Sequence, residues 1–196
     1  MRHLPHRPHR LAVLWVALIF SLALAFRRHR RYATCVGTVH DVAAYVLRKQ
    51  GRMSTWKLQK LVYYSQAWAL VWDGEPIFKA HIEAWANGPV VPELYKKHRG
   101  QFSVDSWEGD PRRLSEDHRA TIDIVLAEYG RLTGRQLSLL THAERPWKEA
   151  RRGLKPTQPG SQTVALESIQ AYYEALDADP EMPSVSAIDW AKLEAR

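Results

Sequence analysis

The sequence contains one long segment with the apolar periodicity of a buried helix, TWKLQKLVYYSQAWALVW at residues 55–72, and any fold must pack around it. Its apolar residues recur at intervals of three and four, which is the period of one face of an α-helix. They are Leu58, Leu61, Val62, Trp68, Ala69 and Trp72. Ser54 precedes the segment and is a good N-cap, because its hydroxyl can accept a hydrogen bond from a free amide of the first turn. The pattern predicts a long core helix.

Shorter segments on either side have a similar periodicity and predict further helices. These cover residues 39–50, Pro92 to Lys96, 115–129, 136–142 and 164–176. Pro92 suits the first turn of its helix, where a missing amide hydrogen costs nothing. Ser115 begins the next helix, and the acidic residues Glu116 and Asp117 are favoured at its amino end. The chain is therefore expected to be mainly α-helical.

Between residues 77 and 86 the apolar period falls toward two, which is typical of one or two short strands. The alternating small or aliphatic residues are Ile82, Ala84 and Ala86. Asn87-Gly88 is the strongest turn pair in the chain, and Pro89 disfavours a helical conformation at Gly88. We predict that Trp85–Pro92 joins a strand to the helix that follows it.

Together these patterns predict a single compact helical domain, mainly α with a small β-hairpin element, in the α+β class. We place this domain at residues 36–176. A polar, turn-rich stretch at 103–113 is expected to be a surface loop. The segment 177–196 contains two prolines and has little periodicity, so we expect a flexible C-terminal tail there.

The net charge of +7 belongs to the beginning of the chain. Of the 28 Lys and Arg residues, seven lie in residues 1–35, which contain no acid, so the remainder carries 21 basic and 21 acidic residues. Phosphate binding needs a clustered excess of Lys and Arg. A neutral body therefore gives no reason to expect a nucleic acid partner.

Residues 1–35 differ from the rest of the chain, and three interpretations of them stay open. They contain the uncharged run LAVLWVALIFSLALAF at 11–26, with arginines on both sides. As a helix this run would be about 24 Å long at roughly 1.5 Å per residue, short of a hydrocarbon core of about 30 Å, so it would make a short membrane anchor. It also resembles a signal peptide, although the arginines after Ala25 oppose translocation. The third interpretation is a start assigned too far upstream, with the natural protein beginning at Val36 or Val39.

Few residues in the sequence are candidates for a catalytic or metal-binding site. Cys35 is the only cysteine and has no obvious activating partner in the sequence. His81 and Glu83 would share one face of a strand, but without a third ligand they favour a surface ion pair over a metal site. His142 and Glu144 could form an acid–base pair, though a histidine at a helix end more often caps the helix. We therefore predict no metal site, no cofactor and no catalytic residue.

The eight tryptophans say more about interactions. Trp68 and Trp72 belong to the apolar stripe of the core helix. Trp85 and Trp147 lie beside turns and prolines, where an indole is often half-exposed and can anchor a protein interface. They could also close the ends of the core, and the sequence leaves both roles open.

Two stretches of the sequence resemble the Panacea domain of SocA-like antitoxins and phage-associated GepA-like proteins. They run from Met53 to Gly100 and from Thr141 to Arg151, and the similarity extends over about residues 40–176. The most specific pieces are Leu58-Gln59-Lys60-Leu61, Tyr63-Tyr64, Glu83-Ala84-Trp85, Gly88-Pro89-Val90, Tyr95, His142 and Pro146-Trp147. Their shared order along the chain makes the resemblance specific, whereas the basic apolar leader at 1–35 departs from the family pattern.

The resemblance implies a bacterial antitoxin that neutralises a neighbour-encoded toxin by direct protein–protein binding, without enzymatic activity. It also implies a cytoplasmic protein that can act as an adaptor and bring its toxin to a cytoplasmic protease. The partner-binding residues expected from the family segments are Trp85, Asn87, Gly88, Pro89, Val90, Tyr95, His142, Pro146 and Trp147. The same residues could instead hold the family fold together.

Two alternative functions remain distinct from this one. A DNA-binding autorepressor would need a basic recognition helix, and the neutral body argues against it. A real membrane anchor at 11–26 would make the chain an interaction protein of the inner membrane.

Overall fold

The computed structural model describes residues 37–181, 184–190 and 193. The chain divides into two units, Met1–Thr34 and Cys35–Arg196, and all of the described residues belong to the second. The predicted leader, with its apolar run at 11–26, lies outside the described residues. Within the part of the chain that is described, no helix has both the length and the apolar character needed to cross a membrane.

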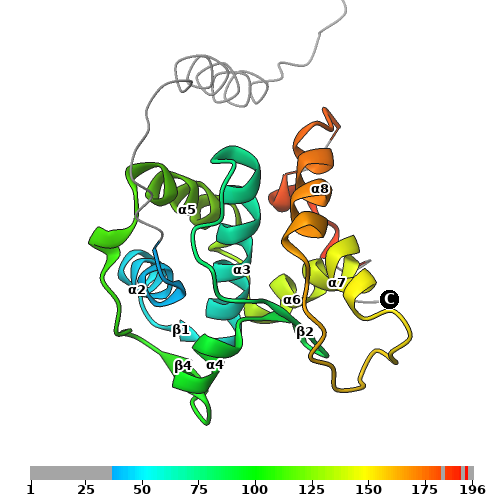
Figure 1. Cartoon of the computed structure of the whole chain (residues 1–196), viewed down its shortest axis with the longest axis horizontal. Helices are drawn as coiled ribbons and strands as arrows, with labels where there is room; N and C mark the ends of the chain where they lie inside the picture. Colours follow the sequence, from blue (N-terminus) through cyan, green and yellow to red (C-terminus); the bar gives the residue numbers. More distant parts are fainter. Residues whose placement is uncertain (1–36, 182–183, 191–192, 194–196) are drawn as a thin grey trace, which may run out of the picture. The chain divides into compact units, whose positions relative to one another are not determined.

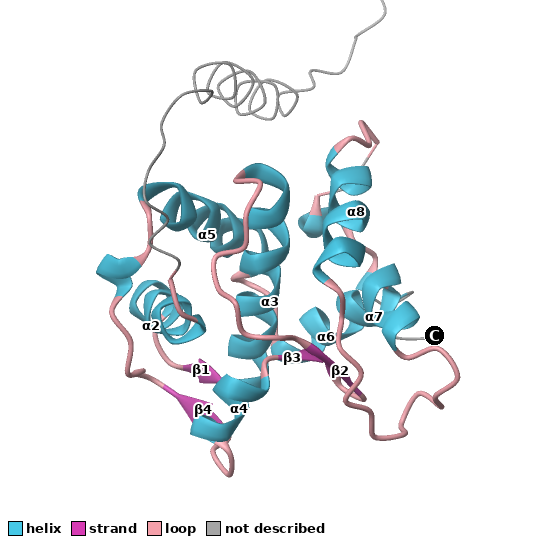
Figure 2. Cartoon of the chain, in the orientation of Figure 1, coloured by secondary structure: helices cyan, strands magenta, loops and turns pink. Residues whose placement is uncertain are grey.

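The described residues form a mainly helical α+β structure, as the sequence predicts (Figure 2). The helices are α2 (Val39–Gln50), α3 (Thr55–Trp72), α4 (Pro92–His98), α5 (Glu116–Tyr129), α6 (Gly134–Ala143), α7 (Arg145–Ala150) and α8 (Leu166–Asp177). Two short antiparallel pairs are β1 (Met53–Ser54) with β4 (Ser103–Val104), and β2 (Glu83–Trp85) with β3 (Gly88–Val90). Short 3-10 turns occur at Pro111–Arg113 and Val185–Ala187.

Helix α3 is the centre of the fold (Figure 1). It packs against α2 and α5 on one side and against α6 and α8 on the other. The predicted N-cap is present, because the amide of Lys57 donates a 3.2 Å hydrogen bond to the hydroxyl of Ser54. Every residue from Leu58 to Leu70 is buried, polar residues included. The prediction of a core helix is confirmed, although the helix is buried on all of its faces rather than along one stripe.

The side chains of two glutamines of α3 form hydrogen bonds with backbone groups of the extended chain that follows the helix. The Gln66 side chain accepts a 2.9 Å hydrogen bond from the amide of Ile77 and donates one of 2.9 Å to the carbonyl of Phe78. The Gln59 carbonyl oxygen likewise accepts a 2.9 Å bond from the amide of Val91. Buried backbone groups need such partners, since leaving one unpaired costs about 1–3 kcal/mol. These contacts fix the path of the chain between α3 and α4.

The predicted strand-to-helix joint is a complete β-hairpin in the structure. Glu83 of β2 pairs with Val90 of β3, and the chain reverses between them at Ala86 and Asn87. The turn lies one residue earlier than the predicted Asn87-Gly88 pair, because Gly88 pairs with Trp85 and begins a second strand before α4. The chain before α8 lies along the outer edge of β2, where the amide of Val164 donates a 2.8 Å hydrogen bond to the carbonyl of Ile82.

Helix α7 and the paired strands β1 and β4 were not predicted. Helix α7 begins directly after α6, with Pro146 in its first turn. Strand β4 lies in the stretch 103–113 that was expected to be a loop. In the segment 177–196, Val185 and Trp190 are partly buried against the core.

Candidate interaction site

Side chains of helices α6 and α7 hold the β2–β3 hairpin in place. The Trp147 indole donates a 2.9 Å hydrogen bond to the main-chain carbonyl of Trp85, at the end of β2. The Ser138 hydroxyl donates a 2.7 Å bond to the carbonyl of Asn87 in the turn. The His142 ring stacks on Trp147, with ring centroids 4.2 Å apart and planes 20° from parallel. These contacts bring together the two segments that carry the predicted binding residues.

Arg151 is a further support of the hairpin that the sequence analysis did not single out. It is 4% exposed, and its guanidinium donates a 2.9 Å bond to the carbonyl of Ala84. A second guanidinium nitrogen, Nη2, donates hydrogen bonds to carbonyls of the loop that follows, at Lys155, Pro156 and Gln158. Its charge also lies 5.1 Å from the centroid of the Trp147 ring. In the sequence, the signal for this residue was its position at the end of the family stretch from Thr141 to Arg151.

Lys60 lies fully buried under the hairpin. Its ammonium nitrogen donates a 3.1 Å hydrogen bond to the carbonyl of Pro89, and burial lowers the pKa of this lysine to about 7. The close approach depends on Gly88, whose φ is +102°. A Cβ atom there would lie 2.6 Å from the Lys60 Cε and 2.8 Å from the Thr141 hydroxyl. The turn glycine therefore serves both the backbone conformation and the packing above the lysine.

The structure does not bring His142 and Glu144 together as an acid–base pair. Burial, followed by the positive charges of Lys60 and Arg151, lowers the pKa of His142 to about 4. The Glu144 carboxyl accepts hydrogen bonds of 2.8 Å from Tyr64 and 2.9 Å from the Tyr173 hydroxyl. Burial raises the pKa of Glu144 to about 7. Glu144 is buried in the domain, whereas His142 is half-buried.

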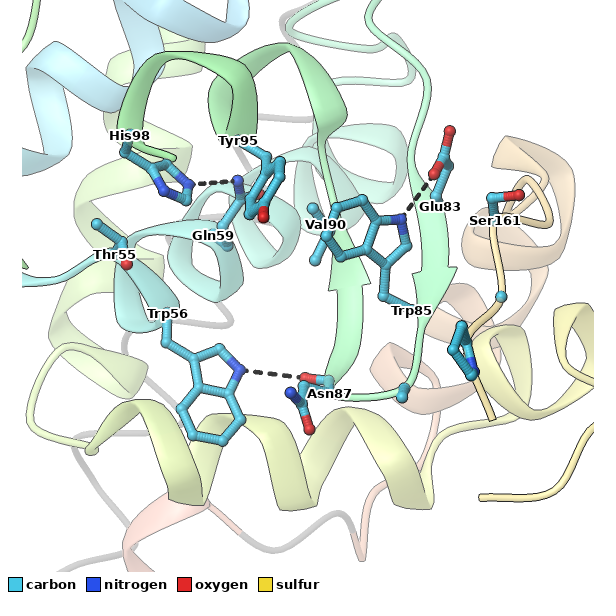
Figure 3. A pocket seen from close by; sticks show the side chains of 13 residues that line it. Thr55, Trp56, Gln59, Glu83, Trp85, Asn87, Val90, Tyr95, His98 and Ser161 are labelled. Carbon is cyan, nitrogen blue, oxygen red and sulfur yellow. Dashed lines mark hydrogen bonds between the residues drawn. The ribbon is translucent and has the colours of Figure 1, made fainter. Parts of the chain in front are cut away.

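A pocket of about 720 Å³ opens on the other side of the hairpin (Figure 3). Four of the predicted residues line it, namely Trp85, Asn87, Val90 and Tyr95. The remaining predicted residues, Gly88, Pro89, His142, Pro146 and Trp147, are not among its lining residues. Helices α3 and α4 and the loop at residues 159–161 supply the rest of the wall.

Aromatic rings dominate the wall of this pocket. Trp85 meets Tyr95 edge to face, with ring centroids 4.7 Å apart, and its indole donates a 2.6 Å bond to Glu83. Across the opening, the indole of Trp56 donates a 3.2 Å bond to the carbonyl of Asn87 (Figure 3). These bonds hold the rings in place, so the pocket is formed before any partner arrives.

Trp56 and His98 are pocket residues that the sequence analysis missed. Trp56 is 39% exposed although it lies in the first turn of the core helix. An aromatic residue outside the apolar stripe was the signal that could have identified it. His98 contacts Gln59 at 2.9 Å, and burial lowers the pKa of His98. Gln59 thus links the pocket wall to Val91 at the start of α4.

His81 and Glu83 form the ion pair that the sequence favoured, with a nitrogen–oxygen distance of 3.1 Å. In the part of the chain that is described, no group of three or more His, Cys, Asp and Glu residues is arranged to hold a metal ion. Glu83 also accepts the bond from Trp85, so it contributes to the shape of the pocket.

Comparison with known proteins shows what this part of the chain is similar to. The family model described as Antitoxin SocA-like, Panacea domain matches residues 58–148. This match covers α3 from Leu58 onward, the hairpin, α4, β4, α5, α6 and part of α7. Residues 58–148 therefore match the SocA-like Panacea domain, as the resemblance in the sequence implied for this part of the chain.

One relative shares this similarity. Antitoxin SocA of Caulobacter vibrioides (strain NA1000 / CB15N) is 31% identical over 110 residues, which cover 48% of this chain and 58% of the relative. The chain thus spans a little more than half the length of this relative. No solved structure matches the chain significantly.

Proposed function

We propose that this protein is an antitoxin that neutralises a neighbour-encoded toxin by binding it directly. The observation that carries the proposal is the Panacea domain at residues 58–148, together with the similarity to a protein named Antitoxin SocA. Neutralisation by binding requires a complementary surface and no catalytic group. We propose accordingly that the protein is not an enzyme. We also propose that it is located in the cytoplasm.

We assign the contact surface to the pocket and its aromatic wall. Trp85 and Tyr95 are partly exposed, rigidly held side chains, and such residues dominate the binding energy of protein interfaces. Asn87 and Val90 complete this part of the wall. The other predicted residues have a different role in this proposal. His142, Pro146 and Trp147, together with the Gly88-Pro89 pair, hold the hairpin in position.

The first experiment uses the full chain with a tag at its carboxyl end, expressed in its native host and purified under mild conditions. Mass spectrometry should identify a stoichiometric partner encoded beside it. That partner should stop growth when expressed alone and be harmless when expressed together with this protein. Recovery of no neighbour-encoded protein, or of one without toxicity, would contradict the proposal.

Two tyrosine variants then test the contact surface. Tyr95→Ala removes a ring from the pocket wall, whereas Tyr172→Ala removes a half-buried ring from α8, outside the pocket lining. We expect Tyr95→Ala to fold, as judged by circular dichroism, and to lose protection against the toxin. Tyr172→Ala should keep protection, and loss of protection in both variants would contradict this assignment.

The proposal extends to an adaptor role in which the bound toxin is delivered to a cytoplasmic protease. The toxin half-life in cells should then become shorter when this protein is present. Equal half-lives with and without the protein, in cells that are protected from the toxin, would leave simple inhibition and exclude the adaptor role.

A further inference from the structure

The neutral body hides an uneven distribution of charge. Three segments contain no acidic residue but several basic ones, namely residues 48–57, 94–104 and 130–137. Their exposed or half-exposed basic residues include Arg52, Lys57, Lys96, Arg99 and Arg131. Lys97 is also among them, but its ammonium lies 3.5 Å from Glu108.

The fold brings these three segments together beside the pocket. The amide of Thr55 donates a 3.0 Å hydrogen bond to the carbonyl of Phe102, and the Arg52 guanidinium bonds the Ser103 hydroxyl at 3.0 Å. At Gly134, a Cβ atom would lie 3.4 Å from the Cβ of Trp56. The starts of α3 and α6 and the chain after α4 therefore meet at one place.

The pocket lies within this basic region. In the sequence, the lining residues Thr55 and Trp56 lie between Arg52 and Lys57, and the lining residues Tyr95 and His98 flank Lys96 and Lys97. Among the described residues, the large hydrophobic side chains classed as exposed are Trp56 at 39% and Phe102 at 88%. Both belong to this region, since Phe102 is bonded through its carbonyl to the pocket residue Thr55. We call the five residues Arg52, Lys57, Lys96, Arg99 and Arg131 the basic rim.

We propose that this surface binds an acidic segment of a partner protein that inserts one large apolar side chain into the pocket. The anchor side chain would pack against Trp56, Trp85 and Tyr95, while acidic residues on either side of it meet the basic rim. This inference rests on the proposed function, because it describes the toxin surface that the antitoxin recognises.

The charges of the region favour a protein segment over other occupants. Glu83 lies in the pocket wall, with its side chain 17% exposed, and would repel any anionic group that entered the pocket, so the group inserted there must be uncharged. Residues 1–35 carry seven arginines and no acid, so they have the same charge sign as the basic rim. An uncharged anchor flanked by carboxylates satisfies both the apolar pocket and its rim.

The test uses fluorescent probes and the full chain. The main probe is a short peptide with a central tryptophan flanked by glutamates. The comparison probes are the same peptide with glutamines, a peptide in which alanine replaces the tryptophan, and a single-stranded oligothymidylate. We expect the first peptide to bind at least about tenfold more tightly than the other three, a difference that salt should reduce. Equal binding of the glutamate and glutamine peptides, or tighter binding of the oligonucleotide, would overturn the proposal.

Charge reversal separates the basic rim from the overall charge. The double variant Lys96→Glu/Arg99→Glu should weaken peptide binding about tenfold or more. The control Lys79→Glu/Arg113→Glu changes the net charge equally at exposed residues outside the basic rim, and should leave binding unchanged. Circular dichroism and sedimentation velocity establish that each variant is folded and report any self-association. Equal weakening in both variants would overturn the proposal.

The same variants distinguish this inference from the function on which it rests. If the wild-type chain protects cells from its neighbour-encoded toxin and Lys96→Glu/Arg99→Glu protects equally well, the inference fails and the antitoxin function stands. If no neighbour-encoded protein is toxic but the acidic peptide binds as expected, the antitoxin function fails and the surface assignment stands.

Discussion

The indole nitrogen of Trp147 donates a 2.9 Å hydrogen bond to the main-chain carbonyl of Trp85, which is 62 residues earlier in the chain. This bond joins α7 to the end of β2, and Arg151 binds the preceding carbonyl, that of Ala84, on the same strand. The side chain of Trp85 is thereby left to line the pocket. One tryptophan holds the backbone while the other forms the candidate interaction surface.

This relationship predicts different effects of two substitutions at Trp147. Trp147→Ala should lower the free energy of unfolding by about 3–5 kcal/mol, because a buried ring and its hydrogen bond are both lost. Trp147→Phe should cost less, since it keeps most of the packing and loses mainly the bond to Trp85. Urea denaturation measures both values. A loss below about 1 kcal/mol for Trp147→Ala would show that the ring does not support the fold.

Gly88 should be far less replaceable than another glycine of similar backbone conformation. Gly88→Ala places a Cβ atom 2.6 Å from Lys60 and also strains a backbone with φ of +102°. Gly100→Ala is the matched control, because its φ is +84° but no atom lies within 4 Å of the added carbon. We expect about 1–2 kcal/mol of destabilisation for Gly100→Ala and clearly more for Gly88→Ala, measured by urea denaturation. Equal losses would mean that the packing above Lys60 yields easily.

Local patterns in the sequence were sufficient for the helices. Ser54 and Ser115 cap α3 and α5 as expected, with bonds of 3.2 Å and 3.0 Å to the amides of Lys57 and His118. Capping and apolar periodicity depend on residues within one or two turns of each other. The fold class follows from these features, because helices of this length need one another to bury their apolar faces.

The pocket could not be predicted in the same way, because its walls come from distant parts of the chain. Strand β3 contains Pro89 and exists through contacts with β2 and Lys60, neither of which a local pattern reveals. The basic rim is invisible in the net charge of the body, since it forms only where three acid-free segments meet. Trp85 was singled out from its place beside a turn, and Tyr95 through the family resemblance, whereas Trp56 was recognised as a pocket residue only in the structure.

Glu144 predicts a loss of stability between acidic and neutral pH. Its folded-state pKa of about 7 lies above the ordinary value of 4.5, so the folded protein keeps a proton that the unfolded chain releases. This contribution to stability is complete below pH 4.5 and is lost as the pH rises through 7, at up to roughly 1.4 kcal/mol per pH unit. Glu144→Gln removes the titration and can still accept a bond from Tyr64 or Tyr173.

The measurement is urea denaturation of both proteins at several values between pH 4.5 and 7. The stability of Glu144→Gln relative to the natural protein should increase as the pH rises across this range. Glu149→Gln is a suitable control, because Glu149 is exposed on α7 and its carboxylate accepts a hydrogen bond from Ser168 at the surface. A pH dependence that is unchanged in Glu144→Gln would contradict a buried, protonated carboxyl at this position.

Lys60 predicts the opposite slope at higher pH. Its pKa of about 7 in the folded protein lies below the ordinary value of 10.5, so the unfolded chain binds a proton that the folded protein lacks. The stability is therefore greatest above pH 10.5 with respect to this group and decreases as the pH falls to about 7. Lys60→Met keeps the length of the side chain and removes the titration, at the cost of the bond to Pro89.

Urea denaturation at pH 7, 8 and 9 should show the natural protein gaining stability with pH while Lys60→Met changes little. The free energy of unfolding of Lys60→Met, relative to that of the natural protein, should therefore decrease as the pH rises, by up to roughly 1.4 kcal/mol per pH unit. Lys96→Met, a change of an exposed lysine on α4, should keep the slope of the natural protein. If Lys60→Met also keeps that slope, the ammonium of Lys60 reaches water in the folded protein, and the hairpin must open above it.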